Sequence, residues 1–227
     1  MNYPIEAIFK TVYDCTKEFK KNLANQKLLV IYEENKETKL CEIFFPASAF
    51  YHLTGLKAFD NKGNMYKAFN FYNDMLNGSI NARNLKKKDK TTDLKIEVLP
   101  QLMKLDRNAK MTGLFFSSRI SLETDQLVGG EKACMGFVVN EKYECYIPNT
   151  LLKEDIRQIS INRGNIIAIL KKKVFDKNYR NITYIKKEYE LENVFKKEET
   201  FKEIDFKNIY SLDKVISNKI NTYKAKP

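Results

Sequence analysis

The sequence predicts an α+β fold, in which N-terminal helices and a hairpin pack on a mostly antiparallel sheet. Three observations lead to this class. Apolar residues recur at helical spacing in several segments of the first half. From residue 110 to residue 186, short apolar and β-branched runs alternate with turn residues, as strands do. The two patterns occupy separate halves of the chain, which is typical of α+β proteins.

The first elements are a helix and a hairpin. Apolar residues at helical spacing, with lysines between them, predict a helix over residues 4–24. Two strand-like runs follow, residues 27–34 and 39–45, and the polar stretch 35–37 between them suits a turn. We therefore expect the two strands to pair as an antiparallel hairpin.

A short helix is expected directly after the hairpin. Proline is common in the first turn of a helix and glycine just past its end, and Pro46 and Gly55 stand in these places. His52 therefore falls in the last turn of this helix.

Two more helices complete the first half. Residues 58–63 are expected to form a loop, and Asn64 can cap a helix that runs to about Asn77. Residues 93–105 predict another helix. Pro100 should kink or divide it, because proline lacks the N–H donor and its ring clashes with the preceding turn.

The second half is expected to be mainly sheet, with one short helix over residues 149–157. The strands are expected over residues 110–118, 125–128, 132–139, 143–147, 165–173 and 181–186. These elements predict a single α+β domain over residues 1–190. A charged C-terminal arm, residues 191–227, follows it, and an amphipathic pattern over 209–223 indicates a last helix there.

The charge balance favours a polyanionic partner. The chain of 227 residues has 40 Lys and Arg against 29 Asp and Glu, a net charge of +11. Such an excess suits nucleic acid and, less often, an anionic membrane surface. A lysine-rich, solvated surface would have the same composition. Neither a run of about 20 apolar residues nor a signal-peptide pattern is seen, so we expect a cytoplasmic protein with no membrane partner.

The cysteines and the single histidine argue against a metal site. The four cysteines, Cys15, Cys41, Cys134 and Cys145, form no close CxxC pair. Nothing marks the chain for secretion, so we expect these residues to be buried free thiols and expect no cofactor.

His52 is the strongest candidate for a catalytic group, because imidazole alone has an unperturbed pKa near neutrality. A helix C-terminus favours its cationic form, which suits chemistry on a phosphate. The alternative is a structural histidine that is satisfied by a neighbouring carbonyl. Thr54 could contact a phosphate oxygen or orient the imidazole, or else make only a local hydrogen bond at the helix end.

The other candidates are cations and one tyrosine. Lys57, Lys110 and Arg119 could stabilise charge on a phosphoryl group, and Tyr146, at a strand end, could orient it. Basic residues expected to hold a nucleic-acid backbone are Lys67, Lys86, Lys87, Lys88, Lys110, Lys171 and Lys172. For each of these side chains, a solvated surface charge is the alternative.

Several segments resemble a known family. These are the stretch Phe50–Gly55, which contains His-Leu-Thr-Gly, the helical segment Ala68–Tyr72, the stretch Tyr146–Leu152 and the closing strands over residues 166–184. Together they resemble the phage nucleases named for barnase, EndoU, colicin and RelE, in their fourth subgroup, over roughly residues 25–190. The resemblance implies helices packed against an antiparallel sheet, and ribonuclease activity without a metal.

The resemblance transfers only two site residues, His52 and Thr54. Many ribonucleases of this kind use two acid–base groups, and a second histidine is absent, so the second role would pass to Lys, Tyr or Glu. The expected function is cleavage of RNA, tRNA among the candidates, by attack of the ribose 2′-hydroxyl, in a phage or mobile element. The alternative is a non-catalytic accessory factor of a mobile element that binds nucleic acid or a protein. A third possibility is an interaction protein whose charged residues 188–223 bind a partner protein or inhibitor, such as a neutralising antitoxin.

Overall fold

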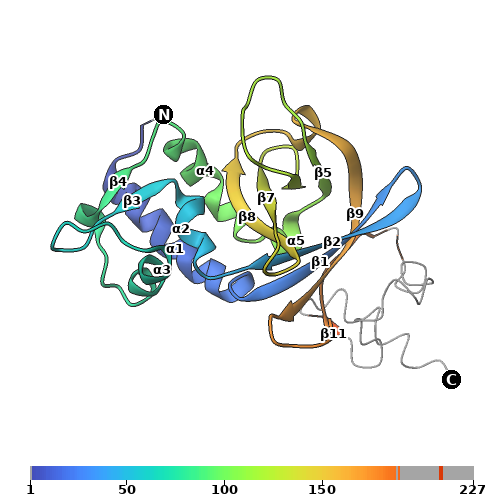
Figure 1. Cartoon of the computed structure of the whole chain (residues 1–227), viewed down its shortest axis with the longest axis horizontal. Helices are drawn as coiled ribbons and strands as arrows, with labels where there is room; N and C mark the ends of the chain where they lie inside the picture. The colour runs from blue at the N-terminus through green and yellow to red at the C-terminus, as the bar shows by residue number, and fades with distance from the viewer. Residues whose placement is uncertain (1, 188, 190–209, 212–227) are drawn as a thin grey trace.

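Helices make up one end of the molecule and a curved sheet the other (Figure 1). The computed structural model describes residues 2–187, 189 and 210–211. The α-helices are α1 (Ile5–Asn22), α2 (Ala49–Thr54), α3 (Ala68–Leu76), α4 (Thr92–Leu102) and α5 (Leu105–Asn108), and the 3-10 helices are η1 (Ala82–Asn84) and η2 (Ile156–Gln158). The strands are β1 (Gln26–Glu34), β2 (Glu37–Phe45), β3 (Leu56–Ala58), β4 (Leu85–Lys87), β5 (Met111–Phe115), β6 (Gln126–Gly129), β7 (Cys134–Asn140), β8 (Cys145–Leu152), β9 (Ser160–Lys173), β10 (Asn181–Ile185) and β11 (Tyr210–Ser211).

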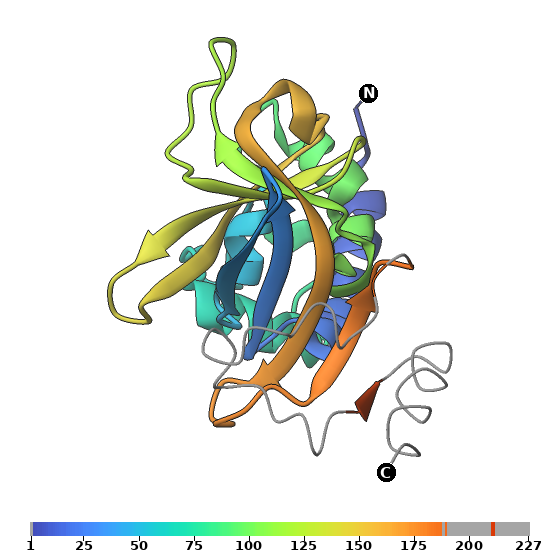
Figure 2. The ribbon, with the colours of Figure 1, turned by 90° about the vertical axis from the view of Figure 1, so that its right-hand side faces the viewer.

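The main sheet closes on itself. Its strand order is β1-β2-β8-β7-β6-β5-β9-β10-β11, and β1 also pairs with β9. Within the described residues, β2–β8 and β10–β11 are the parallel pairs and the remaining pairs are antiparallel. Figure 2 shows the long, curved β9 passing beside β1 and β2, with helices behind them. The predicted class, α+β with a mostly antiparallel sheet, is confirmed.

The closure depends on the length and curvature of β9. Its first residues pair with β5, and from Asn165 to Lys173 it pairs with β1. At the changeover, Gly164 lies directly against the ring of Tyr32, where a Cβ atom would collide with it. Glycine is therefore required where β1 and β9 approach most closely.

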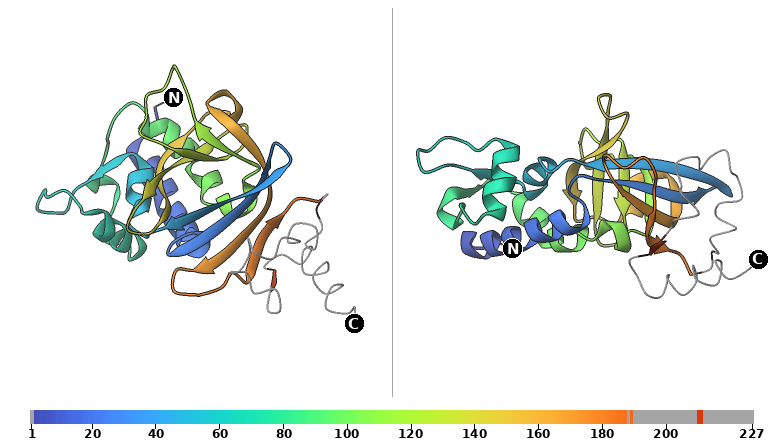
Figure 3. Two further views of the ribbon diagram at one scale, coloured as in Figure 1. Left: turned by 45° about the vertical axis from the view of Figure 1, so that its right-hand side comes forward. Right: turned by 90° about the horizontal axis from the view of Figure 1, so that it is seen from below.

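The helices and the sheet share one apolar core. The buried face of α1 includes Ile8, Val12 and Phe19. The ring of Phe19 contacts those of Phe45 at the end of β2 and Phe50 in α2. In the view from below, α1 lies at the helical end of the molecule, and β1 and β2 extend away from that end (Figure 3).

Most elements of the first half are where the sequence predicts them. The helix over 4–24 and the hairpin are present as α1, β1 and β2. The hairpin turn consists of Asn35 and Lys36, with φ of 53° and 67°. Gly55 ends α2 in the left-handed conformation, with φ of 65°. The helix predicted over 93–105 is present as α4, which runs from Thr92 through Pro100 to Leu102; the chain divides only after Leu102, and α5 begins at Leu105.

The predicted start of α3 is wrong. Asn64 does not cap this helix, because its backbone N–H and its side chain donate instead to the carboxylate of Asp60. Met65 forms a β-bridge with Phe59, and the helix begins only at Ala68.

The predicted helix over residues 149–157 is also wrong. β8 continues to Leu152 because Thr150 to Leu152 pair with β7, and Thr150 and Leu151 are buried there. Only the three residues Ile156–Gln158 form a 3-10 turn. β3 and β4 are strands that the sequence did not predict.

The cysteines are buried and free, as predicted. No helix in the described part of the chain combines the length and the hydropathy that a membrane span requires.

The arm expected over residues 191–227 lies outside the described residues, apart from Tyr210 and Ser211. These two residues form β11 beside β10, whereas the sequence predicted a helix over 209–223. The boundary at residue 190 stays a prediction.

Candidate functional site

A small second sheet presents lysines beside α2. β3 and β4 are antiparallel, and their register places Lys57 directly opposite Lys86. In β3, Leu56 and Ala58 face the core while Lys57 is exposed, so the strand forms by burying alternate residues. The two strands lie at the helical end of the molecule, next to α2 (Figure 1).

Gly55 joins this sheet to α2 and α4. Its carbonyl oxygen accepts the Lys88 N–H at 3.1 Å and the Thr92 hydroxyl at 2.6 Å. The side chain of Lys95 passes over it, with Cδ 3.0 Å from the place a Cβ atom would occupy. The end of α2 is therefore fixed to the end of β4 and the first turn of α4.

His52 is exposed in the last turn of α2, as the sequence predicted. Partial burial lowers the pKa of its imidazole below 6.5, and the charges of Lys88 and Lys95 lower it further. The expectation that the helix C-terminus would favour the cation is therefore reversed by the surroundings. At neutral pH the ring is mainly neutral and can accept a proton.

Lys95 is a further candidate site residue, which the sequence did not indicate. Its side chain is half-buried, and this burial lowers its pKa, as does the charge of Lys88, whereas Asp89 opposes the shift. Asp89 itself is held by Thr91, whose N–H and hydroxyl donate to the carboxylate. Perturbed lysine and histidine side chains that influence each other are typical of functional sites.

These side chains form what we call the cationic cluster, which consists of His52, Lys57, Lys86, Lys88 and Lys95. Four of the five are exposed and Lys95 is half-buried. The arrangement can attract an anion such as a phosphodiester, and it offers a neutral imidazole next to ammonium groups.

Thr54 does not face this cluster. Its side chain is fully buried, and its hydroxyl donates to the Tyr51 carbonyl at 2.8 Å and accepts the Leu56 N–H at 3.2 Å. The expectation that it could contact a phosphate is wrong, and the local hydrogen bond at the helix end is what the structure shows.

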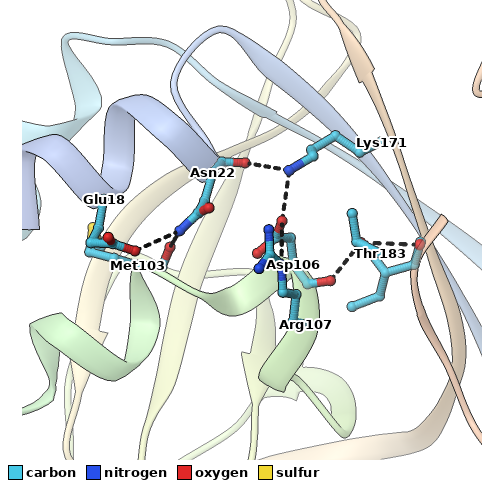
Figure 4. A network of polar contacts seen from close by, with 8 residues as sticks. Glu18, Asn22, Met103, Asp106, Arg107, Lys171 and Thr183 are labelled. Carbon is cyan, nitrogen blue, oxygen red and sulfur yellow. Dashed lines mark hydrogen bonds and ion pairs between the residues drawn. The ribbon is translucent and has the colours of Figure 1, made fainter. Parts of the chain in front are cut away.

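Three of the lysines expected on a nucleic-acid surface are engaged elsewhere. Lys87 lies on the other face of β4, where its ammonium forms an ion pair with Asp93 at 2.7 Å. Lys171 is buried and pairs with Asp106 at 2.7 Å, among the residues drawn in Figure 4. Lys172 is also buried, over the ring of Tyr179. The expectation that Lys171 and Lys172 face solvent is wrong, because β9 lies inside the structure there.

The other candidates lie on different elements. Arg119 is exposed in the loop between β5 and β6, which projects away from β3 and β4 in Figures 1 and 3. Lys110 precedes β5, with its ammonium 4.0 Å from the Tyr184 ring centroid. Tyr146 is half-buried in β8, where burial raises the pKa of its hydroxyl. Lys67 is exposed just before α3.

Neither thiol nor metal chemistry is evident among the described side chains. Burial raises the pKa of Cys41 and Cys134 to about 12, which keeps these thiols protonated. Within the described ranges, no three His, Cys, Asp or Glu side chains gather closely enough to hold a metal ion.

Comparison with known proteins gives one match. Searches of curated proteins and of solved structures each returned nothing similar. The family model described as phage-Barnase-EndoU-ColicinE5/D-RelE like nuclease4 matches residues 11–188, which include the whole cationic cluster and most of the main sheet. This confirms the resemblance found in the sequence. The chain belongs to this family of barnase-, EndoU-, colicin- and RelE-like nucleases, and its substrate is therefore a nucleic acid.

Proposed function

We propose that the protein is a metal-independent ribonuclease in which His52 is the general acid–base group. The observation that carries the proposal is the solvent-accessible imidazole of His52 at the end of α2, whose pKa is lowered by partial burial and by the charges of Lys88 and Lys95. Membership of a nuclease family supports a nucleic acid as the substrate. A neutral imidazole beside ammonium groups suits attack by a ribose 2′-hydroxyl, because it takes up the proton while the cations stabilise the phosphate.

The proposed reaction needs two proton transfers. His52 takes the proton of the 2′-hydroxyl as that oxygen bonds to the adjacent phosphorus. The bond from phosphorus to the 5′-oxygen breaks, and Lys95, whose pKa is lowered, gives that oxygen a proton. The products are a 2′,3′-cyclic phosphate and a free 5′-hydroxyl. Lys95 thereby fills the role for which the chain has no second histidine.

The remaining members of the cationic cluster have electrostatic roles in this proposal. Lys88 stabilises charge on the transferring phosphoryl group, and Lys57 and Lys86 hold the neighbouring backbone. The proposed setting is the cytoplasm of a cell that carries a phage or mobile element, where the enzyme would act as a toxin or a related factor.

The reaction class is tested with an oligoribonucleotide and its 2′-deoxy copy in excess EDTA. Cleavage of the RNA alone, leaving cyclic phosphate ends, is expected. In the same assay, His52→Ala should lower the rate about 10²- to 10⁴-fold. Cleavage of both oligonucleotides, or cleavage only after Mg²⁺ is added, would contradict the mechanism. Salt-sensitive binding without any cleavage would favour the accessory-factor alternative.

A further inference from the structure

The face of β3 and β4 that carries Lys57 and Lys86 has an unbalanced charge. These lysines are directly opposite each other, and like charges in that position destabilise a strand pair. Within the described part of the chain, neither forms an ion pair, whereas Lys87, on the opposite face of β4, is paired with Asp93. The described residues therefore supply no neutralising partner for this face.

The same face continues into an apolar pair. Phe59, two residues after Lys57, forms a bridge with Met65, and the bonds Tyr66 N–H to Ala58 O and Asp60 N–H to Asn64 O flank that bridge. Side chains in such a pair lie on the same side of the ladder and close together.

Two observations show that the apolar pair and the lysines share one surface. The ammonium of Lys86 lies 5.4 Å from the centroid of the Phe59 ring, which places this ring on the lysine side. Met65 is 63% exposed, a high value for a large apolar side chain. We call this surface, made by Lys57, Phe59, Met65, Lys86 and Lys88, the β3–β4 face.

The β3–β4 face leads to His52. At about 3.3 Å per residue, Lys88 and Lys86 are roughly 7 Å apart along the strand direction, as are Lys57 and Phe59. Among the lysines of this face, Lys88 lies close enough to His52 to lower the pKa of its imidazole. Cations thus extend from the imidazole to the apolar pair, in which Met65 is exposed and Phe59 is half-buried.

This pattern matches single-stranded RNA better than a duplex. A single strand presents both phosphates and the faces of unpaired bases, and proteins bind it with cations and with apolar or aromatic side chains. In a duplex the base faces are stacked inside, so Phe59 and Met65 would meet only sugar and phosphate.

We propose that the β3–β4 face binds single-stranded RNA, with phosphates at Lys57 and Lys86 and an unpaired base against Phe59 and Met65. This placement brings a nearby phosphodiester to His52. That the substrate is RNA rests on the proposed function. The new points are that this RNA is single-stranded and that the β3–β4 face binds it.

The test measures binding by fluorescence anisotropy in EDTA, with a labelled oligoribonucleotide and a hairpin duplex as probes. The His52→Ala variant serves as the background, so that the probe stays intact. Adding Lys57→Gln with Lys86→Gln should weaken single-strand binding at least tenfold and reduce the salt slope by about 1.4, since each contact contributes about 0.7. The matched control, Lys20→Gln with Lys21→Gln on exposed positions of α1, removes the same charge and should change the Kd less than twofold.

A third variant tests the base contact. Met65→Ala should weaken single-strand binding several-fold and leave duplex binding unchanged, because its exposed side chain contributes little to the core. An equal loss of single-strand affinity in the Lys57/Lys86 and Lys20/Lys21 variants would overturn the proposal. So would a duplex that is bound as tightly as the single strand.

The outcomes also separate this inference from the proposed function. If wild type cleaves RNA and the Lys57/Lys86 variant cleaves equally well at low substrate concentration, RNA binding by the β3–β4 face is refuted and the ribonuclease proposal stands. If the single strand binds as expected and wild type does not cleave it, the ribonuclease proposal fails and the face stands.

Discussion

The pKa of His52 is lowered first by partial burial of the imidazole and then by two lysines that come from different elements. Lys88 follows β4 and Lys95 lies in α4, and both lower the pKa of the imidazole. A base with a lowered pKa resists protonation in the folded protein. Protonating His52 therefore costs more in the folded protein than in the unfolded chain. The part of the free energy of unfolding that depends on a neutral His52 is fully present above the unfolded pKa near 6.5, and it is lost as pH falls through the folded pKa.

The pKa of His52 can be measured without ambiguity, because the chain has one histidine. A titration of its Cε1–H signal by NMR should give a value below 6.5, and Lys88→Gln should raise it by removing a positive charge. Lys20→Gln, which removes an equal charge from α1, should leave the value unchanged. A lower pKa in the Lys88 variant would contradict the placement of these groups.

At the residue scale, the sequence identifies His52 and part of its surroundings. The histidine stands out because it is unique, Lys57 stands out as a charge near it in the chain, and Lys86 and Lys88 stand out as members of a basic run. Lys95 could not be recognised, because its role depends on the turn at Gly55 and on the packing of α4. Lys171 looked like part of a surface run, but its burial follows from sheet closure.

At the element scale, the end of α2 is a junction of three elements. Gly55 combines a left-handed φ of 65° with a close approach to Lys95, and its carbonyl binds β4 and α4. β3 and β4 have three residues each, too few to show a strand period in the sequence. They form because Leu56, Ala58 and Leu85 are buried.

Replacing Gly55 tests this junction. Gly55→Ala should lower the free energy of unfolding by at least about 1–2 kcal/mol, the usual cost of a left-handed non-glycine residue. It should also slow RNA cleavage, because the added methyl displaces Lys95. Urea denaturation and single-turnover kinetics measure the two effects.

Gly78→Ala is the matched control for that variant. Gly78 ends α3 with φ of 73°, and nothing lies within 4 Å of its Cβ position. This variant should lose comparable backbone stability while cleavage of the folded enzyme is unaffected. If both variants slowed cleavage equally, the contact between Gly55 and Lys95 would not matter for the site.

At the scale of the whole molecule, a buried polar network joins the helices to the sheet (Figure 4). Lys171 in β9 donates to the Asp106 carboxylate at 2.7 Å and to the Asn22 carbonyl at 3.1 Å. Thr183 in β10 donates to the Asp106 carbonyl at 2.6 Å. The network links α1, α5, β9 and β10, elements that are far apart in the sequence.

Breaking this network should destabilise the fold without affecting the site. Lys171→Met removes the close partner of the buried Asp106 carboxylate and leaves it only the Arg107 guanidinium at 3.8 Å, at a cost of about 3–5 kcal/mol. Lys173→Met, an exposed position in the same strand, should cost far less. Urea denaturation compares them, and the RNA affinity of the folded Lys171 variant should equal that of wild type. A similar loss of stability in both variants would contradict the buried pair.

The α+β class was predictable because helical and strand periods occupy different halves of the chain. Closure of the sheet was not, since β1 and β9 pair across more than a hundred residues and nothing in either strand specifies the other. The continuation of β8 past Asn149 shows the same limit, because Asn149 and Thr150 resembled a helix start and pairing with β7 decided otherwise.

The role of His52 is measured most directly by the single-turnover rate of RNA cleavage in EDTA between pH 5 and 8, for wild type and His52→Ala. We expect the wild-type rate to fall at acid pH, with a midpoint below 6.5, as His52 becomes protonated. The variant should be about 10²- to 10⁴-fold slower near neutrality and lack that acid limb. Equal rates and the same pH profile in both proteins would show that His52 takes no part in the chemistry.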